Sequence, residues 1–274
     1  MSVAEAIRAA TTKLEVTSDT ARLDAELLMA HALGVSRSDM LLRHMPDTAP
    51  ATYDDLISRR AAREPVAHIT GHQEFYGRGF AVTSDTLIPR GDSEVLIDTA
   101  LELAAKAMRV LDLGTGTGAL LITVLLELEG ASGIATDQSQ EALKVAEGNA
   151  RMLGLDQTRA RFECRDWTKE GWAEGLGQFD LVLCNPPYIE DAAALAPDVR
   201  EFEPASALFA GPDGLDDYRI LIPQLRALMT VGAIAILEIG HTQAEAVTRI
   251  AQGHSFNVRL RKDLAGRPRC LILS

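Results

Sequence analysis

The stretch VLDLGTGTGAL, residues 110 to 120, joins three local patterns that together indicate one kind of fold. Its apolar beginning is typical of a buried strand, and the apolar residues after Gly118 are typical of a helix. Between them, Gly114, Gly116 and Gly118 let the backbone turn tightly and approach a ligand closely. A glycine-rich turn between a strand and a helix predicts a nucleotide-binding loop.

An acidic residue follows at the end of the next predicted strand. Asp137 comes 23 residues after Gly114, where a carboxylate can hydrogen-bond both hydroxyls of an adenosine ribose. Gly114, Gly116 and Ala119 also satisfy the dinucleotide pattern of nicotinamide enzymes. Asp112 favours S-adenosylmethionine instead, because its carboxylate precedes the first glycine by two residues and suits a cationic ligand terminus.

Strand and helix patterns alternate from Gly91 to the end of the chain. This alternation predicts an α/β fold, with a Rossmann-like, seven-stranded and mostly parallel sheet between helices. The last two strands are joined by a short link, so we expect one of them to be antiparallel. The predicted strands cover residues 108–114, 132–137, 160–166, 179–185, 232–240, 256–262 and 269–274. The predicted helices cover residues 118–129, 139–154, 216–229 and 242–253.

The N-terminal part has a different character. Segments 3–14, 19–34 and 51–64 space their apolar residues three and four apart, which predicts a small helical bundle over residues 1–70. Asp19 or Thr20 is a candidate cap of the second helix, and Gly34 a candidate end. Residues 71–90 alternate aromatic residues with glycine and polar residues, which predicts a β-hairpin that links this bundle to a domain over residues 91–274.

The overall composition limits the classes of partner. A formal net charge of -12 argues against an interface with a nucleic-acid backbone, which relies on clustered lysine and arginine. The three cysteines have no metal-ligand spacing and indicate free thiols in a reducing compartment, with Cys164 and Cys184 in apolar runs that predict core positions. No secretory signal and no bilayer-spanning stretch is apparent, so we expect a cytoplasmic protein, with monomer as the default.

Two more predicted strands end in residues suited to a binding site. Asp166 and Trp167 follow the third strand, where a carboxylate can accept a hydrogen bond from an adenine amino group and an indole can stack on the ring. The fourth strand ends in Asn185, Pro186, Pro187 and Tyr188. Because the carboxyl ends of the strands line the ligand crevice in open α/β folds, these residues should face the glycine loop.

The Asn-Pro-Pro-Tyr turn suits a planar NH2 group. Prolines fix their own φ and offer rigid carbonyl acceptors, Asn185 adds a side-chain carbonyl, and Tyr188 supplies an aromatic wall. Two such acceptors favour a tetrahedral amide nitrogen, whose lone pair is then localised and aimed at a sulfonium methyl. The transfer is a direct displacement that depends on positioning and needs no metal.

The combination of DLGTGTG and NPPY resembles methyltransferases that act on planar nitrogens. The segments EPVAHITGHQEFYGRGFAV, LIPRGDSE, EPASALFAGPDGLDDYRIL, LEIGHTQ and DLAGRPRCLIL are similar to those of the release-factor glutamine methyltransferases, over most of residues 64 to 274. The resemblance implies an S-adenosylmethionine-dependent enzyme that methylates N5 of the glutamine in the Gly-Gly-Gln motif of peptide chain release factors. It also implies an N-terminal domain that recognises the partner.

The resemblance assigns roles to particular residues. It implies that Asn185, Pro186, Pro187 and Tyr188 hold the glutamine amide. It implies that the methyl donor contacts Gly114, Thr115, Gly116, Thr117, Gly118, Asp137, Trp167 and Asn185, to which the position of Asp112 and Asp166 in the sequence adds two candidate contacts.

The residues around LIPRGDSE leave some questions open. The family usually has proline and threonine at the positions of Gly91 and Ser93, which leaves Arg90 and Glu94 in place. Arg90 and Glu94 either shape the substrate pocket or pair with each other as a structural link. Glu238 ends a predicted strand, where it either bonds loop amides or, as we expect, has a structural role. His72 and His241 are expected to be structural or exposed.

Three alternative functions compete with the leading one. A ribosomal-protein glutamine methyltransferase shares the chemistry and differs in its partner. A nucleic-acid adenine methyltransferase shares NPPY, but the charge and the small helical domain disfavour it. A nicotinamide-dependent oxidoreductase shares the glycine loop but leaves NPPY unexplained.

Overall fold

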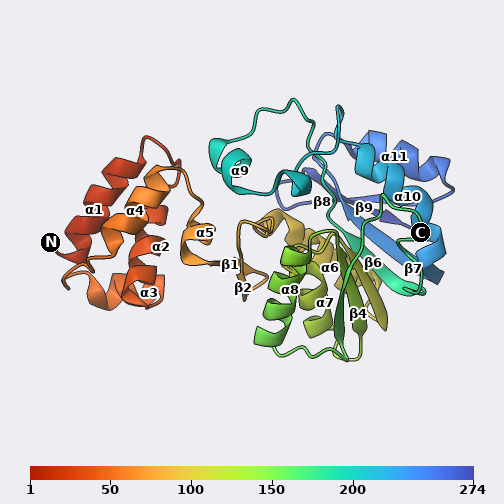
Figure 1. Cartoon of the computed structure of the whole chain (residues 1–274), viewed down its shortest axis with the longest axis horizontal. Helices are drawn as coiled ribbons and strands as arrows, with labels where there is room; N and C mark the ends of the chain where they lie inside the picture. Colours follow the sequence, from red (N-terminus) through yellow and green to blue (C-terminus); the bar gives the residue numbers. More distant parts are fainter. The chain divides into compact units, whose positions relative to one another are not determined.

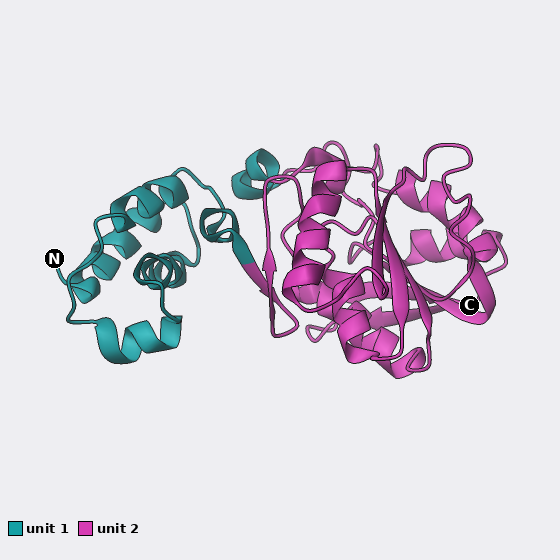
Figure 2. Cartoon of the chain, turned by 60° about the horizontal axis from the view of Figure 1, so that its bottom comes forward, with its two compact units in different colours: residues 1–72, 195–202 teal, residues 73–194, 203–274 magenta.

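The computed structural model describes all 274 residues, Met1 to Ser274 (Figure 1). They group into two compact units, coloured separately in Figure 2. Residues 1–72 and 195–202 form unit 1, and residues 73–194 and 203–274 form unit 2. Unit 1 has one hydrophobic core of its own, and unit 2 has two.

Unit 2 is built on a seven-stranded sheet with the strand order β5-β4-β3-β6-β7-β9-β8. Strands β3 to β7 run parallel, and β9 is antiparallel to both β7 and β8. The order reverses at β3, whose two neighbours β4 and β6 both follow it in the chain. The strands are β3 (Arg109–Leu113), β4 (Ser132–Asp137), β5 (Ala160–Cys164), β6 (Phe179–Cys184), β7 (Met229–Glu238), β8 (Val258–Lys262) and β9 (Pro268–Leu273).

Helices cover both faces of this sheet (Figure 1). Successive residues of a strand point to opposite faces, so Val110 packs into one core and Leu111 into the other. Helices α6 (Glu94–Leu103), α7 (Ala119–Glu127) and α8 (Gln140–Met152) contribute to the first core, and α10 (Asp216–Leu228) and α11 (Ala244–Gly253) to the second.

These elements confirm the predicted fold class. All seven predicted strands are present, and β9 is the expected antiparallel strand. The four predicted helices correspond to α7, α8, α10 and α11. The pattern analysis missed α6, although its buried residues Leu96, Ile97 and Ala100 have helical spacing.

The expectation that Cys164 belongs to the core is wrong. Cys164 is the last residue of β5, which lies at the edge of the sheet, and its side chain is exposed. An edge strand has a neighbour on one side only, so its end is poorly covered. Cys184, on the central strand β6, is buried as expected.

Unit 1 is helical, as the sequence predicts. Its three predicted helices are present as α1, α2 and α4, and several shorter helices were not predicted. The helices are α1 (Val3–Leu14), α2 (Ala21–Leu33), α3 (Arg37–Asp39), the π-helix η1 (Met40–His44), α4 (Tyr53–Ala61), α5 (Val66–Thr70) and α9 (Pro197–Phe202).

The caps of α2 agree only in part with the sequence patterns. Gly34 ends the helix with a φ of 68°, a left-handed conformation that favours glycine. Thr20 stands at the N-cap, but its hydroxyl donates to the carboxylate of Asp24 at 2.9 Å and bonds no helix amide. Asp24 also forms a buried ion pair with Arg60 at 2.7 Å.

The predicted hairpin consists of β1 (His72–Phe75) and β2 (Arg78–Ala81). Its two-residue turn places Tyr76 at a φ of 52° and Gly77 at 70°, the positive values that such hairpin turns require. Phe75 and Phe80 pack edge to face, with ring centroids 6.2 Å apart.

Along the whole chain, the helices fall short of the length and apolar character that a membrane crossing requires.

Candidate functional site

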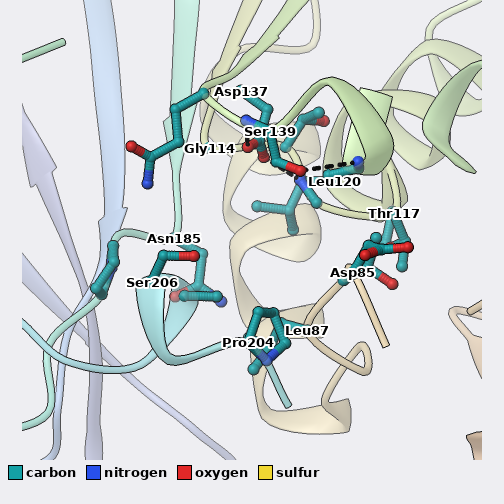
Figure 3. Close-up of a pocket in the computed structure, with 18 of the residues that line it drawn as sticks. Asp85, Leu87, Gly114, Thr117, Leu120, Asp137, Ser139, Asn185, Pro204 and Ser206 are labelled. Carbon is teal, nitrogen blue, oxygen red and sulfur yellow. Dashed lines mark hydrogen bonds between the residues drawn. The ribbon is translucent and has the colours of Figure 1, made fainter. Parts of the chain in front are cut away.

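A cavity of about 310 Å³ lies in unit 2 at the carboxyl ends of β3, β4 and β6. Its volume falls within the usual range for small-molecule sites. Figure 3 shows Gly114, Asp137, Thr117 and Asn185 arranged around it. Its walls come from six parts of the chain: Phe75, residues 85–93, the glycine loop with the start of α7, residues 137–142, residues 166–168, and the segments that follow β6.

The glycine loop has the backbone conformation that its sequence predicts. Gly114, Gly116 and Gly118 have φ values of 71°, 55° and 82°, which residues other than glycine rarely adopt. The amides of Gly114 and Thr115 both donate to the carbonyl oxygen of Thr136, at 2.9 and 3.0 Å. The loop is therefore fixed to the end of β4 before any ligand binds.

Asp137 organises the next corner of the cavity. One carboxylate oxygen accepts the amide of Gly116 at 2.9 Å, and the other accepts the amide of Ser139 at 2.9 Å. Burial raises the pKa of Asp137, against these backbone hydrogen bonds. Each carboxylate oxygen has a second acceptor site, so both can still receive a ligand hydroxyl.

Asp112 lies beneath the loop and does not line the cavity. Its side chain is 1% exposed, and Thr115 Oγ1 donates to its Oδ2 at 2.6 Å. Its Oδ1 makes no hydrogen bond. Burial raises the pKa of Asp112 to about 7, against the hydrogen bond from Thr115. Gly118, likewise, is behind the lining, whereas Thr115 and Thr117 contribute to it.

Asp166 and Trp167 both line the cavity, as predicted from their position after β5. Trp167 Nε1 donates to Asp217 Oδ1 at 2.8 Å, which fixes the indole plane. One oxygen of Asp166 accepts both the hydroxyl and the amide of Thr168, at 2.6 and 2.9 Å. The hydroxyl of Thr168 is the main reason that the pKa of Asp166 is lowered.

The turn after β6 brings two of its four residues to the cavity. Asn185 and Pro187 line it, whereas Pro186 is buried and Tyr188 packs into the second core of unit 2. The side-chain amide of Asn185 makes no hydrogen bond within the chain. Neither proline carbonyl accepts one either. Three acceptors are therefore free in this turn.

The charged residues near the turn have partners that the sequence did not reveal. Arg90 lines the cavity and pairs with Glu203, while Glu94 accepts the amide of Tyr76 at 2.8 Å. The two do not form the link with each other that was one of the two options. Glu238 accepts the hydroxyl groups of Ser93 and Tyr188, and not the loop amides that were one of its two options.

Sequence patterns missed two contributors to the site. The segment Asp85 to Leu87, inside the predicted linker, lines the cavity. In Figure 3, Asp85 and Thr117 lie across from Asn185 and Ser206. Asn149 is buried in α8 and donates to the carbonyl oxygens of Thr117 and Ala81, at 2.9 and 3.0 Å. The sequence signal for these hydrogen bonds is an asparagine at an apolar position of a predicted helix.

The chain contains no group of three or more histidine, cysteine, aspartate or glutamate residues that could hold a metal ion. The groups that line the cavity are main-chain groups, single carboxylates, hydroxyls, the side-chain amides of Gln138 and Asn185, the guanidinium of Arg90 and aromatic rings. Such a set recognises an organic ligand through hydrogen bonds and shape.

Comparison with known proteins defines the class. A family model described as the PrmC N-terminal domain matches residues 5–71, and one described as a methyltransferase domain matches residues 104–215. The catalytic domain of hMettl16, solved with a MAT2A 3′UTR hairpin, shares the fold with a TM-score of 0.57. It is 14% identical, and the match covers 80% of each chain. The fold and the matched domain are those of a methyltransferase.

Two relatives identify the family. The release factor glutamine methyltransferase of Cereibacter sphaeroides is 43% identical over 277 residues, which is 98% of this chain and 97% of that protein. The protein of the same name from Rhodospirillum rubrum is 42% identical over 259 residues, which is 92% of this chain and 78% of that protein. This chain belongs to the family of release factor glutamine methyltransferases.

Proposed function

We propose that this enzyme transfers a methyl group from S-adenosylmethionine to N5 of the glutamine in the Gly-Gly-Gln motif of peptide chain release factors. Family membership supports the class of acceptor, since the relatives are named release factor glutamine methyltransferases. The observation that carries the proposal is the turn after β6, where Asn185 faces the cavity and three acceptors have no partner.

The free acceptors match the chemistry of a primary amide. An amide NH2 group offers two donors, and the side-chain oxygen of Asn185 together with a proline carbonyl can accept both. The prolines hold their carbonyls rigidly because their φ angles are fixed. Hydrogen bonds in these directions favour a tetrahedral nitrogen with a localised lone pair. After methylation the nitrogen is strongly acidic, and its proton leaves to solvent.

The glycine-loop side of the cavity fits the methyl donor, which supplies an electrophilic methyl group on a sulfonium. Asp137 has two oxygens with acceptor capacity for the ribose hydroxyls. Asp166 and Trp167 stand where an adenine ring would need an acceptor and a flat apolar surface. Asp112 would act through Thr115 and the loop, because its own carboxylate lies outside the lining.

The partner follows from the same proposal. A release factor would present its glutamine as part of a folded domain, and the helical residues 1–70 are the candidate recognition unit, joined by residues 71–90 to a catalytic domain over 91–274. The proposal needs no metal, no direct nucleic-acid contact and no membrane. A monomer in the cytoplasm suffices for it.

A methyl-transfer assay tests the proposal. Purified release factor, its Gly-Gly-Gln→Gly-Gly-Ala variant and total ribosomal protein would each be incubated with enzyme and labelled donor. The label would then be located by mass spectrometry. We expect label on the one glutamine of the release factor and none on the variant.

Other distributions of label would replace the proposal. Label confined to a ribosomal protein would keep the chemistry and change the partner. Label on no protein, while S-adenosylhomocysteine binds the enzyme, would overturn the protein substrate. Addition of duplex DNA or structured RNA to the same assay would then identify a nucleic-acid acceptor.

A further inference from the structure

One carboxylate is buried directly behind the cavity. Glu238 is the last residue of β7, and only 2% of its surface is exposed. Its Oε1 accepts the hydroxyl of Tyr188 at 3.2 Å, and its Oε2 accepts the hydroxyl of Ser93 at 2.5 Å. Burying a charged group is costly unless hydrogen bonds or charges compensate it. The fold nevertheless places a carboxylate here, where both of its oxygens are used.

The two hydroxyls belong to separate segments that line the cavity. Ser93 is itself a lining residue and is the N-cap of α6. Tyr188 follows the lining residues Asn185 and Pro187 in the turn after β6. Glu238 therefore attaches two walls of the cavity to the end of one central strand. Neither wall contributes another side chain to this carboxylate.

A second side chain holds Tyr188 at its other end. Gln243, five residues after Glu238, donates to the carbonyl oxygen of Tyr188 at 2.9 Å. The Oε1 of Gln243 accepts the amide of Gly240 at 3.0 Å, which orients the side chain. Gly214 permits this approach, because a Cβ there would lie 2.3 Å from the Tyr188 oxygen. Tyr188 is thus fixed at both its hydroxyl and its carbonyl.

The surroundings of Glu238 explain how the buried carboxylate is tolerated. Burial raises the pKa of Glu238, while the hydrogen bond from Ser93 and the charge of Arg269 oppose the rise. Arg269 is itself buried and pairs with Asp92 at 2.7 Å and with Asp263 at 3.3 Å. Asp92 and Ser93 are adjacent, so this ion pair holds the same wall that Glu238 holds.

We propose that Glu238 is a positioning residue for the amide acceptor site: through Tyr188 and Ser93 it sets the place of the Asn185 turn relative to the opposite wall. This inference rests on the proposed function, because it assigns the turn to the acceptor amide. Transfer depends on near-attack geometry, in which a displacement of about 1 Å costs on the order of 100-fold in rate. A small shift of the turn therefore lowers kcat more than it lowers binding.

The test removes each hydroxyl in turn. Tyr188→Phe and Ser93→Ala each take away one hydrogen bond to Glu238 and leave the carboxylate in place. We expect each to lower kcat by about tenfold, as a partial displacement would. We also expect less than about a threefold change in KM for release factor and in Kd for S-adenosylhomocysteine, since these variants leave most binding contacts in place.

The matched control is Tyr218→Phe. Tyr218 is buried, and its hydroxyl donates to the backbone oxygen of Glu238 at 2.7 Å, away from the carboxylate. Loss of the Tyr218 hydroxyl should lower the Tm as much as loss of the Tyr188 hydroxyl does. We expect kcat, measured well below the Tm, to stay within about twofold of wild type. A kcat in Tyr218→Phe reduced as far as in Tyr188→Phe would reduce Glu238 to a structural role.

Coupling provides the second readout. In an enzyme that carries Glu238→Ala, the further change Tyr188→Phe should have no additional effect on kcat, because the bond is already lost. Glu238→Gln retains a carbonyl acceptor and should recover part of the rate. Full additivity of the two changes, or no effect of Tyr188→Phe in the wild-type background, would overturn the proposal.

A measurement that needs no substrate separates this inference from the proposed function. Hydrogen exchange of residues 185–190 should accelerate in Glu238→Ala and not in Tyr218→Phe, because only the first releases the Tyr188 side chain. Unchanged exchange in Glu238→Ala would refute the positioning role. Faster exchange in an enzyme that methylates no release factor would leave positioning in place and refute the proposed acceptor.

Discussion

Gly114 and Trp167 lie side by side in the lining of the cavity: a Cβ added to Gly114 would be 3.0 Å from Cη2 of the indole. Gly114 follows β3, and Trp167 follows β5, two strands away in the sheet. The indole is also tethered by its hydrogen bond to Asp217. The glycine loop and the indole are thus packed as one surface, and the ring has little freedom to retreat.

This contact predicts the effect of Gly114→Ala. Alanine would be strained at a φ of 71°, and its methyl group would push the tethered indole away from the loop. We expect the Kd for S-adenosylhomocysteine, measured by calorimetry, to rise about tenfold or more, equivalent to about 1.4 kcal/mol.

Gly148→Ala is the matched control for that measurement. Gly148 lies inside α8, where an added Cβ would meet no atom within 4 Å. Alanine there should raise the free energy of unfolding by about 0.5–1 kcal/mol and leave the Kd unchanged. Weaker binding in both variants would mean that the loss is not specific to the loop.

Asn185→Ala tests the proposed amide acceptor. The variant loses one of the free acceptors, while the glycine loop and Asp137 are untouched. We expect kcat for release factor methylation to fall about 100-fold or more, as for the loss of one preorganised polar group, with the Kd for S-adenosylhomocysteine changed by less than about fivefold. Unchanged turnover in this variant would contradict the proposed role of the turn in binding the amide.

A further prediction changes the methyl-accepting side chain of the release factor and leaves the enzyme as it is. A release factor in which the Gly-Gly-Gln glutamine is replaced by glutamate presents a carboxylate, which cannot donate to the two acceptors of the turn. Methylation, followed by mass spectrometry under single-turnover conditions, should fall by at least about 10⁴-fold. Glutamate methyl ester formation at a comparable rate would indicate a pocket of a different kind.

Local sequence patterns were sufficient for the sheet and for the loop around Gly114. The apolar runs of β3 and β6, broken only by Asp112 and Asp180, are easy to recognise because both strands are buried on both faces. The carboxyl ends of such parallel strands lie at the same edge of the sheet. The proximity of Asn185 and Asp137 to the glycine loop therefore followed from topology alone.

Contacts made across long sequence separations could not be predicted in this way. Ser93 and Glu238 are 145 residues apart, and nothing in either local pattern names the other. Arg90 pairs with Glu203 and not with Glu94, and this partner could not be predicted for the same reason. Cys164 shows the related limit on burial, because an apolar-looking run does not tell whether its strand lies at the centre or the edge of the sheet.

The buried carboxylate of Asp112 predicts a dependence of stability on pH. Its pKa in the folded protein is about 7, against an ordinary value of 3.8. The folded state therefore binds the proton more tightly than the unfolded state does. The stabilisation is fully present below pH 3.8 and is lost as the pH rises through about 7.

Asp112→Asn should remove this dependence, because the amide does not ionise and its oxygen can still accept the hydroxyl of Thr115. We expect the free energy of unfolding of wild type, minus that of the variant, to fall as the pH rises from 3.8 to about 7. Where the unfolded residue is ionised and the folded one protonated, the slope should approach about 1.4 kcal/mol per pH unit. Urea unfolding of both proteins across this range measures the difference directly, and the subtraction cancels the similar contribution of Asp137. A difference that stays constant with pH would show that the pKa of Asp112 is the same in the folded and unfolded protein, so that the hydrogen bond from Thr115 offsets the effect of burial.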